Sequence, residues 1–239
     1  MQLIILAAGR GSRLPKKFRD NPKCLTKING KTILEHNLNF YLKFKKRIIV
    51  TGYKNWQIKK FAKEFNFKII NNKKYRSTNM VYSLFLTKKF INDSVVICYG
   101  DIIFDKNIFK IFNKFENLIP LYLNWLSLWK KRMGLKYIKN DAEDVVVKNK
   151  KLIKIGTKIK KYPKSQFMGI VKISKNSYFR LLNFFTKNCD NKIDMTSFLN
   201  KSIDNKMLKL NVKEVKNFWF EIDTHKDVKT TSKLLKNIT

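Results

Sequence analysis

Short apolar runs that alternate with helical patterns over the first 105 residues constrain the fold of this chain most strongly. Runs that are apolar on both faces and end near glycine or a polar residue are typical of parallel strands buried between helices. Four such runs are predicted as strands: Met1–Ala8, Arg47–Gly52, Lys68–Asn71 and Ser94–Asp101. Apolar residues at helical spacing predict helices over 32–43, 57–65 and 79–89. The alternation predicts an α/β fold with a mixed, mostly parallel sheet flanked by helices.

The pattern changes after Asp105. Shorter strands are predicted over 144–147, 152–155, 169–173, 208–212 and 218–222. Helices are predicted over 176–186, 195–203 and 226–236. The first two of these strands form a hairpin around Lys148–Lys151. We therefore expect a single domain over residues 1–239 that carries a small β-rich insertion in its second half.

The charge of the chain is extreme, with 52 Lys and Arg residues against 17 Asp and Glu residues and a formal net charge of +35. Such a charge fits a nucleic-acid-binding protein built on an inactive α/β scaffold, which is the alternative from another functional class. However, the excess is almost entirely lysine, is spread along the whole chain and accompanies no nucleic-acid-binding motif. Compositional drift is therefore the favoured explanation, and we expect no nucleic-acid partner. The charge still attracts small anionic substrates.

The three cysteines, Cys24, Cys98 and Cys189, are odd in number and far apart. This spacing argues against a disulfide framework and against a metal site with paired cysteines. The chain begins with an apolar strand instead of a charged segment before a long apolar core, which argues against a signal peptide. No apolar run has the length of a membrane span, so we expect a cytoplasmic protein without membrane insertion.

The loop after the first strand reads Leu6-Ala-Ala-Gly-Arg-Gly-Ser-Arg-Leu14. In an open α/β sheet, the first strand-to-helix loop commonly binds phosphate, and its glycines let the backbone approach the anion. The loop lacks the Gly-Lys-Ser/Thr ending of the P-loop and the third glycine of the dinucleotide-binding motif. By itself it is equally compatible with a phosphate loop and with a tight turn between strand and helix.

The wider segment Leu3–Leu25 reads LIILAAGRGSRLPKKFRDNPKCL. It resembles the signature of the sugar-phosphate and choline-phosphate nucleotidyltransferases, LAAGxGxRL followed by PK. The resemblance implies a Rossmann-like nucleotidyltransferase domain that transfers a nucleoside monophosphate to a phosphate and releases pyrophosphate. It also implies a nucleotide-binding half, residues 1–105, and a half that binds the acceptor and completes the metal site, residues 106–239.

The same resemblance implies roles for residues of the loop and of the segment after it. The nucleotide is expected to contact Leu6, Ala7, Ala8, Gly9, Gly11 and Ser12. Arg13 is expected to bind the β- and γ-phosphates, and Lys23 to neutralise charge near the α-phosphate. Transfer of this kind depends on positioning and charge compensation and needs no nucleophile from the enzyme.

An enzyme that uses a nucleoside triphosphate needs Mg²⁺, which takes oxygen ligands. Asp101 ends the fourth predicted strand after Gly100, and Asp223 ends the late strand in Glu221-Ile-Asp223. Both aspartates resemble the metal-binding aspartates of the family. Asp101 is also expected to be catalytic, and Gly100 to contact the nucleotide. For Asp223 the alternative is the N-cap of the following helix.

The segment Tyr75–Leu84 resembles a conserved segment of the bacterial choline-phosphate cytidylyltransferases, and its equivalent in sugar nucleotidyltransferases reads the base. Thr78, Asn79 and Ser83 are therefore expected to line the cytosine of CTP, because an amide can both donate to and accept from the cytosine edge. The alternative for Asn79 is a helix cap.

Segments around Trp125, Asp141 and Asp194 resemble a subgroup that uses choline phosphate, 2-aminoethylphosphonate or phosphoglutamine. The residues expected to bind the acceptor are Trp125, Trp129, Asp141, Glu143, Trp219 and Glu221. Core packing is the alternative for the tryptophans. The predicted activity is Mg²⁺-dependent transfer of CMP from CTP to a small anionic phosphate or phosphonate, for surface polysaccharide, lipid or phosphonate biosynthesis. A sugar-1-phosphate or molybdenum-cofactor-type nucleotidyltransferase is the closer alternative, and a homodimer stays open.

Overall fold

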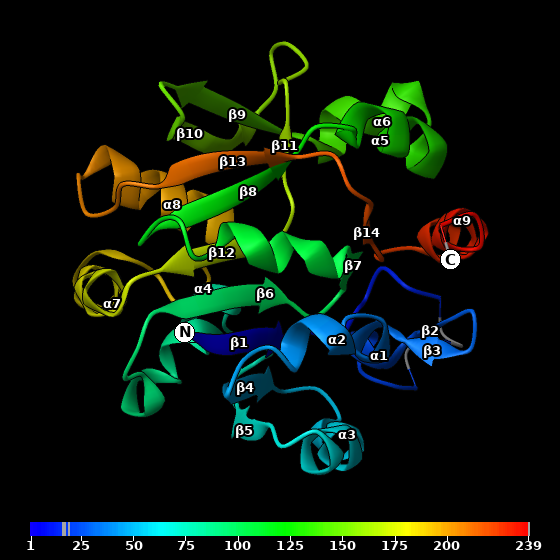
Figure 1. Cartoon of the computed structure of the whole chain (residues 1–239), viewed down its shortest axis with the longest axis horizontal. Coiled ribbons are helices and arrows are strands. Elements are labelled where there is room, and N and C mark those ends of the chain that lie inside the picture. The colour runs from blue at the N-terminus through cyan, green and yellow to red at the C-terminus, as the bar shows by residue number, and fades with distance from the viewer. Residues whose placement is uncertain (16–17, 19, 239) are drawn as a thin grey trace.

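One mixed β-sheet organises the protein in the computed structural model, which describes residues 1–15, 18 and 20–238 (Figure 1). Within these residues the sheet has ten strands, in the order β5-β4-β1-β6-β12-β8-β13-β10-β9, and β11 pairs with β8. The strands of this sheet are β1 Gln2–Ala7, β4 Lys46–Thr51, β5 Lys68–Asn71, β6 Val95–Tyr99, β8 Leu118–Tyr122, β9 Glu143–Lys148, β10 Lys151–Lys158, β11 Gln166–Phe167, β12 Ile170–Ile173 and β13 Asn211–Val215. The predicted mixed sheet is confirmed.

The four strands at one edge of the sheet, β5, β4, β1 and β6, run parallel. Leu6 on β1 is in register with Val50 on β4 and with Tyr99 on β6. The carboxyl ends of these strands therefore lie together, which is the edge where open α/β sheets bind ligands. Beyond β6 the sheet changes direction, because β12 runs antiparallel to both β6 and β8.

Helices cover both faces of the sheet because successive side chains of a strand point to opposite sides. Leu3 and Ile5 of β1 belong to the core cluster that includes residues of α1, α2, α3 and α5. Ile4 and Leu6 belong to the opposite cluster, with α4, α7 and α8. The helices are α1 Ile33–His36, α2 Leu38–Tyr41, α3 Lys59–Glu64, α4 Met80–Phe85, α5 Trp125–Met133, α6 Leu135–Asp141, α7 Lys175–Asn188, α8 Met195–Asp204 and α9 His225–Leu235. The 3₁₀ helices are η2 Lys23–Leu25, η3 Asn55–Ile58, η4 Lys88–Phe90 and η5 Lys106–Ile111.

The helix predicted over 32–43 is divided at Asn37 into α1 and α2. The buried Asn37 amide donates to the carbonyl oxygen of Ile102 at 2.6 Å, and its oxygen accepts from the backbone N–H of Phe104 at 3.2 Å. A polar side chain that bonds the backbone of a distant strand outweighs the propensity for a continuous helix.

A small pair of antiparallel strands lies beside the main sheet, formed by β7 Ile102–Phe104 and β14 Trp219–Glu221. Ile102 is in register with Glu221, and the backbone N–H of Ile222 donates to the carbonyl oxygen of Asp101 at 2.9 Å. This pairing joins the end of β6 to a segment about 120 residues later in the chain.

The predicted hairpin corresponds to β9 and β10, and it continues the main sheet at the edge opposite β5 (Figure 1). The strand predicted over 208–212 lies three residues later, at β13. The strand β8, with Pro120 at its centre, was missed because proline in an apolar run argues against a strand. In the described residues, every helix is too short or too polar to cross a membrane.

Candidate active site

The glycine loop follows β1 at the carboxyl edge of the parallel strands. Gly11 has a φ of +68°, and the backbone N–H of Leu14 donates to its carbonyl oxygen at 3.0 Å. A Cβ on Gly11 would lie 3.1 Å from the Cβ of Lys23, so glycine leaves room for that side chain. Ser12 and Arg13 are exposed. The loop thus turns sharply, and its backbone at Gly11 packs against the Lys23 side chain.

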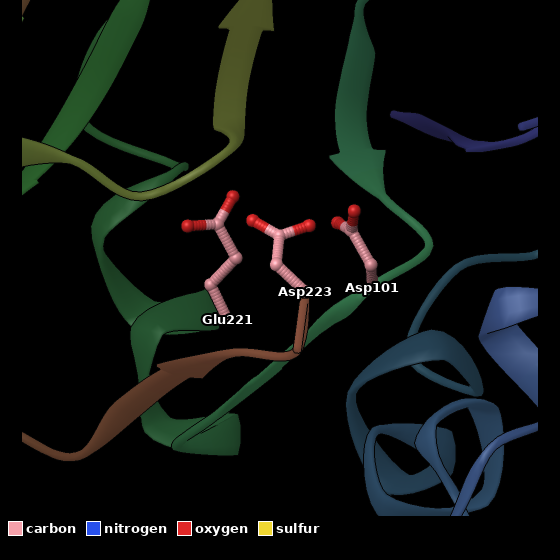
Figure 2. Close-up of side chains that lie close together, drawn as sticks. All are labelled: Asp101, Glu221 and Asp223. Carbon is pink, nitrogen blue, oxygen red and sulfur yellow. The ribbon is translucent and has the colours of Figure 1, made fainter. Parts of the chain in front are cut away.

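Three carboxylates meet next to this loop: Asp101, Glu221 and Asp223, with one oxygen of each within 4.8 Å of the others (Figure 2). Asp101 follows β6, Glu221 ends β14 and Asp223 lies two residues beyond it. The pairing of β7 with β14 therefore assembles the group. Asp223 is not the cap of α9, because Thr224 is the N-cap and its side chain accepts from the backbone N–H of Asp227.

The Lys23 ammonium lies between two of these carboxylates. It donates to Asp101 at 2.6 Å and also to Asp223. Arg13 donates to the same Asp223 oxygen at 2.9 Å. Burial alone would lower the pKa of Lys23, but the Asp101 and Asp223 carboxylates raise it above its usual range. Lys23 is therefore a permanent positive charge in this site.

The carboxylates fit a divalent cation. The Asp101 Oδ1 atom is buried and has no hydrogen-bond partner, which leaves it available as a ligand. Burial and the neighbouring Asp223 raise the pKa of Glu221 to about 8, although Arg132 opposes this shift. Crowded, desolvated carboxylates of this kind are stabilised by a bound cation, and oxygen donors are what Mg²⁺ prefers. Asp101, Asp223 and Glu221 are the residues that would hold it. Glu221, predicted to bind the acceptor, lies in this group as well.

Two cavities adjoin the carboxylates. The first, here called the loop cavity, has a volume of about 140 Å³ and is lined by Leu6, Ala8, Gly9, Asn72, Tyr75, Thr78, Asn79, Met80, Ser83, Tyr99 and Asp101. The second, here called the tryptophan cavity, has a volume of about 230 Å³. It is lined by Arg13, Met80, Tyr99, Ile102, Trp129, Asp141, Glu143, Gln166, Phe167, Gly169, Asp194, Met195, Thr196, Trp219, Glu221 and Asp223. Met80 and Tyr99 line both cavities, so the two spaces are neighbours.

Most residues predicted to contact the nucleotide line the loop cavity. Among the described residues of that prediction, four lie outside its lining: Ala7, Gly11, Ser12 and Gly100. Asn79 lines the cavity and is also the N-cap of α4, where its side-chain oxygen accepts from the backbone N–H of Met80. The cap interpretation of Asn79 is confirmed, and its position in the cavity lining leaves the predicted contact with the base as a prediction.

Asn72 is a site residue that the sequence did not reveal. Its amide donates to the hydroxyls of Thr78 and Ser83, each at 3.0 Å, and so orients two side chains that line the loop cavity. Its position was a usable signal, because it directly follows β5 at the carboxyl edge of the sheet.

The predicted acceptor residues line the tryptophan cavity, with one exception that corrects the prediction. Trp125 lies outside the cavity lining, and like Trp129 and Trp219 it is almost completely buried. Its indole N–H donates to the carbonyl oxygen of Pro163, and its ring packs edge-on against Trp129 at 5.9 Å. Trp125 is therefore a core residue that supports Trp129, as the core-packing alternative holds.

A buried arginine connects α5 to the carboxylate group. Arg132 donates to Asp227 at 2.8 Å and to Glu221 at 3.4 Å, and its guanidinium lies 4.5 Å from the Trp129 ring centroid. The other Asp227 oxygen accepts from the backbone N–H of Asp223 at 3.0 Å. Arg132 and Asp227 thus fix the segment that carries two of the three carboxylates.

Comparison with known proteins identifies relatives of this chain. Residues 3–113 match the MobA-like NTP transferase domain. A CTP:phosphoglutamine cytidylyltransferase from Campylobacter jejuni is 30% identical over 251 aligned positions, which cover 95% of this chain and 98% of that protein. A choline-phosphate cytidylyltransferase from Haemophilus influenzae is 39% identical over 111 residues, 46% of this chain and 47% of that protein.

Solved structures share the fold. The inositol-1-phosphate CTP transferase from T. maritima has a TM-score of 0.78 at 22% identity, over 99% of this chain and 95% of its own. A CTP:phosphocholine cytidylyltransferase from Streptococcus pneumoniae has a TM-score of 0.77 at 22% identity, over 98% of both chains.

Proposed function

The chain belongs to the nucleotidyltransferase family that includes the bacterial phosphoglutamine and choline-phosphate cytidylyltransferases, and we propose that it is a Mg²⁺-dependent cytidylyltransferase. It transfers CMP from CTP to a small phosphate or phosphonate that carries an amine, and it releases pyrophosphate. Phosphocholine, 2-aminoethylphosphonate and phosphoglutamine are the acceptor types considered.

One observation carries this proposal: two neighbouring cavities meet at a group of cationic and carboxylate side chains. Asp101 lines the loop cavity, whereas Arg13 and Asp223 line the tryptophan cavity. Lys23 bonds both aspartates. A reaction between two bound substrates needs their reacting atoms at a common boundary, and this arrangement supplies one.

The chemistry requires no covalent enzyme intermediate. An oxygen of the acceptor phosphate attacks the α-phosphorus of CTP in line, and a new P–O bond forms. The bond between the α-phosphorus and the oxygen that bridges to the β-phosphorus breaks, and its electron pair leaves with pyrophosphate. The acceptor oxygen is already anionic, so no general base is needed.

The role of the chain is to position the substrates and to compensate charge. Lys23 offers a permanent positive charge at the boundary of the cavities, and Arg13 offers a second one from the loop. Fixed cations at the non-bridging oxygens stabilise the charge that the transition state redistributes. A bound Mg²⁺ supplies further neutralisation of the phosphates when it is held by Asp101, Asp223 and Glu221.

The choice of CTP is supported by the loop cavity and by the names of the relatives. Thr78, Asn79 and Ser83 present hydroxyl and amide groups to a cavity of about 140 Å³. Such groups suit the cytosine edge, which has both donors and acceptors. Three relatives that align over nearly the whole length of both chains are named for the use of CTP.

Pyrophosphate release tests the proposal directly. The purified protein is incubated with CTP, ATP, GTP or UTP, with Mg²⁺ or EDTA, and with phosphocholine, 2-aminoethylphosphonate, phosphoglutamine or hexose 1-phosphates. We expect release with CTP, Mg²⁺ and an amine-bearing acceptor. If hexose 1-phosphates are the only acceptors in the panel that support pyrophosphate release, the sugar-1-phosphate alternative holds instead. Release in EDTA would contradict the requirement for Mg²⁺.

A further inference from the structure

The charge of the tryptophan cavity is opposite to that of the molecule. A chain with a net charge of +35 and only 17 acidic residues lines this cavity with five carboxylates and one guanidinium, that of Arg13. Glu221 and Asp223 belong to the group that fits Mg²⁺. Three carboxylates remain, those of Asp141, Glu143 and Asp194. A ligand that fills this end of the cavity must offset their charge.

A second metal ion does not explain these three carboxylates. In the described part of the chain, the group of at least three side chains close enough to share one ion consists of Asp101, Glu221 and Asp223. Asp141, Glu143 and Asp194 form no such group. They line the cavity separately, and an organic cation with N–H groups can accept their charge without one ion being shared among all three.

Glu143 has the poorest supply of donors among the three carboxylates. Asp194 accepts from the backbone N–H and the hydroxyl of Ser197, each at 2.8 Å, and Asp141 accepts from the Trp129 indole N–H at 2.8 Å. The Thr196 hydroxyl lies 2.8 Å from a Glu143 oxygen and 3.0 Å from an Asp194 oxygen, but it has a single proton to donate. Burial and the charges of Asp194 and Asp141 raise the pKa of Glu143, although the Thr196 hydroxyl opposes this shift. A ligand with N–H groups would relieve this deficit at Glu143.

The aromatic rings of the cavity are engaged with the protein itself. Trp129 and Trp219 stack on each other, with centroids 5.3 Å apart and planes at 12°. The cation over the Trp129 ring is the guanidinium of Arg132, at 4.5 Å. A cage for a quaternary ammonium needs several ring faces turned toward the ligand. Here Trp129 and Trp219 face each other instead, and Tyr99 and Phe167, which also line the cavity, contact each other edge-on with centroids 5.8 Å apart.

We propose that the acceptor carries a primary ammonium group that donates to Glu143, with Asp141 and Asp194 adding negative charge around it, and that this cavity selects it over a trimethylammonium group. The inference rests on the proposed function and names the substrate class of the same site. A primary ammonium offers three N–H donors, each able to form a charge-assisted hydrogen bond with a carboxylate. A trimethylammonium offers none, so it leaves Glu143 desolvated with the shared Thr196 hydroxyl as its donor.

Matched pairs of acceptors test the proposal. Phosphoethanolamine is compared with phosphocholine, and 2-aminoethylphosphonate with its N-trimethyl derivative, by pyrophosphate release with CTP and Mg²⁺. We expect kcat/KM to be about 10- to 100-fold higher for the primary amine of each reactive pair. The N-methyl and N,N-dimethyl forms of phosphoethanolamine should fall between the two ends, since each methylation removes one donor.

The variant Glu143→Gln keeps the size of the side chain and removes its charge. It should reduce the preference for the primary amine about tenfold. Glu214→Gln is the matched control, because Glu214 pairs with the exposed Lys164 outside the tryptophan cavity, and it should keep the full preference. Stabilisation of Glu143→Gln by CTP against heat shows that the variant is folded and binds nucleotide.

The outcomes separate the two proposals. An equal or higher kcat/KM for the trimethylammonium acceptors overturns the selection of a primary amine and leaves the cytidylyltransferase activity intact. A preference that Glu143→Gln and Glu214→Gln keep equally overturns the role of the carboxylates. If CTP yields pyrophosphate with none of the acceptors in the panel, the proposed function itself fails, and this inference fails with it.

Discussion

Replacing Arg132 by methionine tests whether the buried ion pairs behind the site hold it together. The side chains of Arg132 and Asp227 are each 3% exposed and lie 2.8 Å apart, and Glu221 shares the same guanidinium. Methionine retains much of the apolar stem but leaves two buried carboxylates without this cation. Removing one partner of a buried pair costs about 3–5 kcal/mol, and loss of the contact with Trp129 adds about 0.5–2 kcal/mol. The two contributions together amount to about 3.5–7 kcal/mol, and we expect a loss of at least about 4 kcal/mol of unfolding free energy.

Urea unfolding at pH 7, followed by tryptophan fluorescence, measures this loss. For a chain of this size, about 4 kcal/mol corresponds to a fall of roughly 10 °C in Tm. Lys164→Met is the control, because Lys164 is 77% exposed in its pair with Glu214 and such pairs contribute about 1 kcal/mol or less. If Arg132→Met and Lys164→Met lose the same small amount, the reasoning from buried charge is refuted.

Three further predictions concern protonation, thiol reactivity and backbone geometry. Burial raises the pKa of Asp227, but hydrogen bonds from a buried guanidinium and two backbone N–H groups outweigh this and hold it below its usual range. The stabilisation that the Asp227 carboxylate contributes is therefore complete above about pH 4 and is lost as the pH falls through the folded-state pKa. In urea unfolding, Asp227→Asn should lower the free energy of unfolding by about 3 kcal/mol at pH 7 and by less at pH 3. In the native protein, Ellman's reagent should rapidly modify one thiol per chain, that of the half-buried Cys189. Cys24 and Cys98 are buried, and burial raises the pKa of Cys24 to about 12, so both should react only after unfolding. Rapid reaction of all three thiols would contradict this burial. Gly169→Ala should lower the free energy of unfolding by about 1–3 kcal/mol, because Gly169 has a φ of +73° and a Cβ would lie 2.8 Å from the Tyr99 ring. Unchanged stability in urea would contradict this geometry.

Local features of the sequence were sufficient to predict the positions of the glycine loop, Lys23 and Asp101. The apolar run of β1, the two glycines after it and the motif that ends at Lys23 are contiguous, so their geometry follows from a strand and a tight turn. Asp101 was also predictable, because it follows β6 and carboxyl ends of parallel strands meet at one edge. These inferences need only the pattern of apolar side chains along each strand and the direction in which the parallel strands run.

The contacts across the chain were not predictable in the same way. Glu221 joins Asp101 because β14 pairs with β7, and no local pattern specifies the partner of a three-residue strand. Trp125 and Trp129 are both tryptophans and are separated by about one turn of α5, yet of the two only Trp129 lines the tryptophan cavity. Which face of α5 turns toward the cavity depends on the Arg132 ion pairs with β14 and α9, and these are visible only in three dimensions.

Following the α-phosphorus of CTP tests the central claim most directly. The protein is incubated with CTP labelled with ³²P at the α-position, Mg²⁺ and 2-aminoethylphosphonate or phosphoglutamine, and the products are separated by chromatography. We predict that the label moves into a CMP conjugate of the acceptor, that the released pyrophosphate is unlabelled, and that Asp101→Ala abolishes the transfer. Label that stays in CTP with every acceptor, or equal transfer by Asp101→Ala, would contradict it.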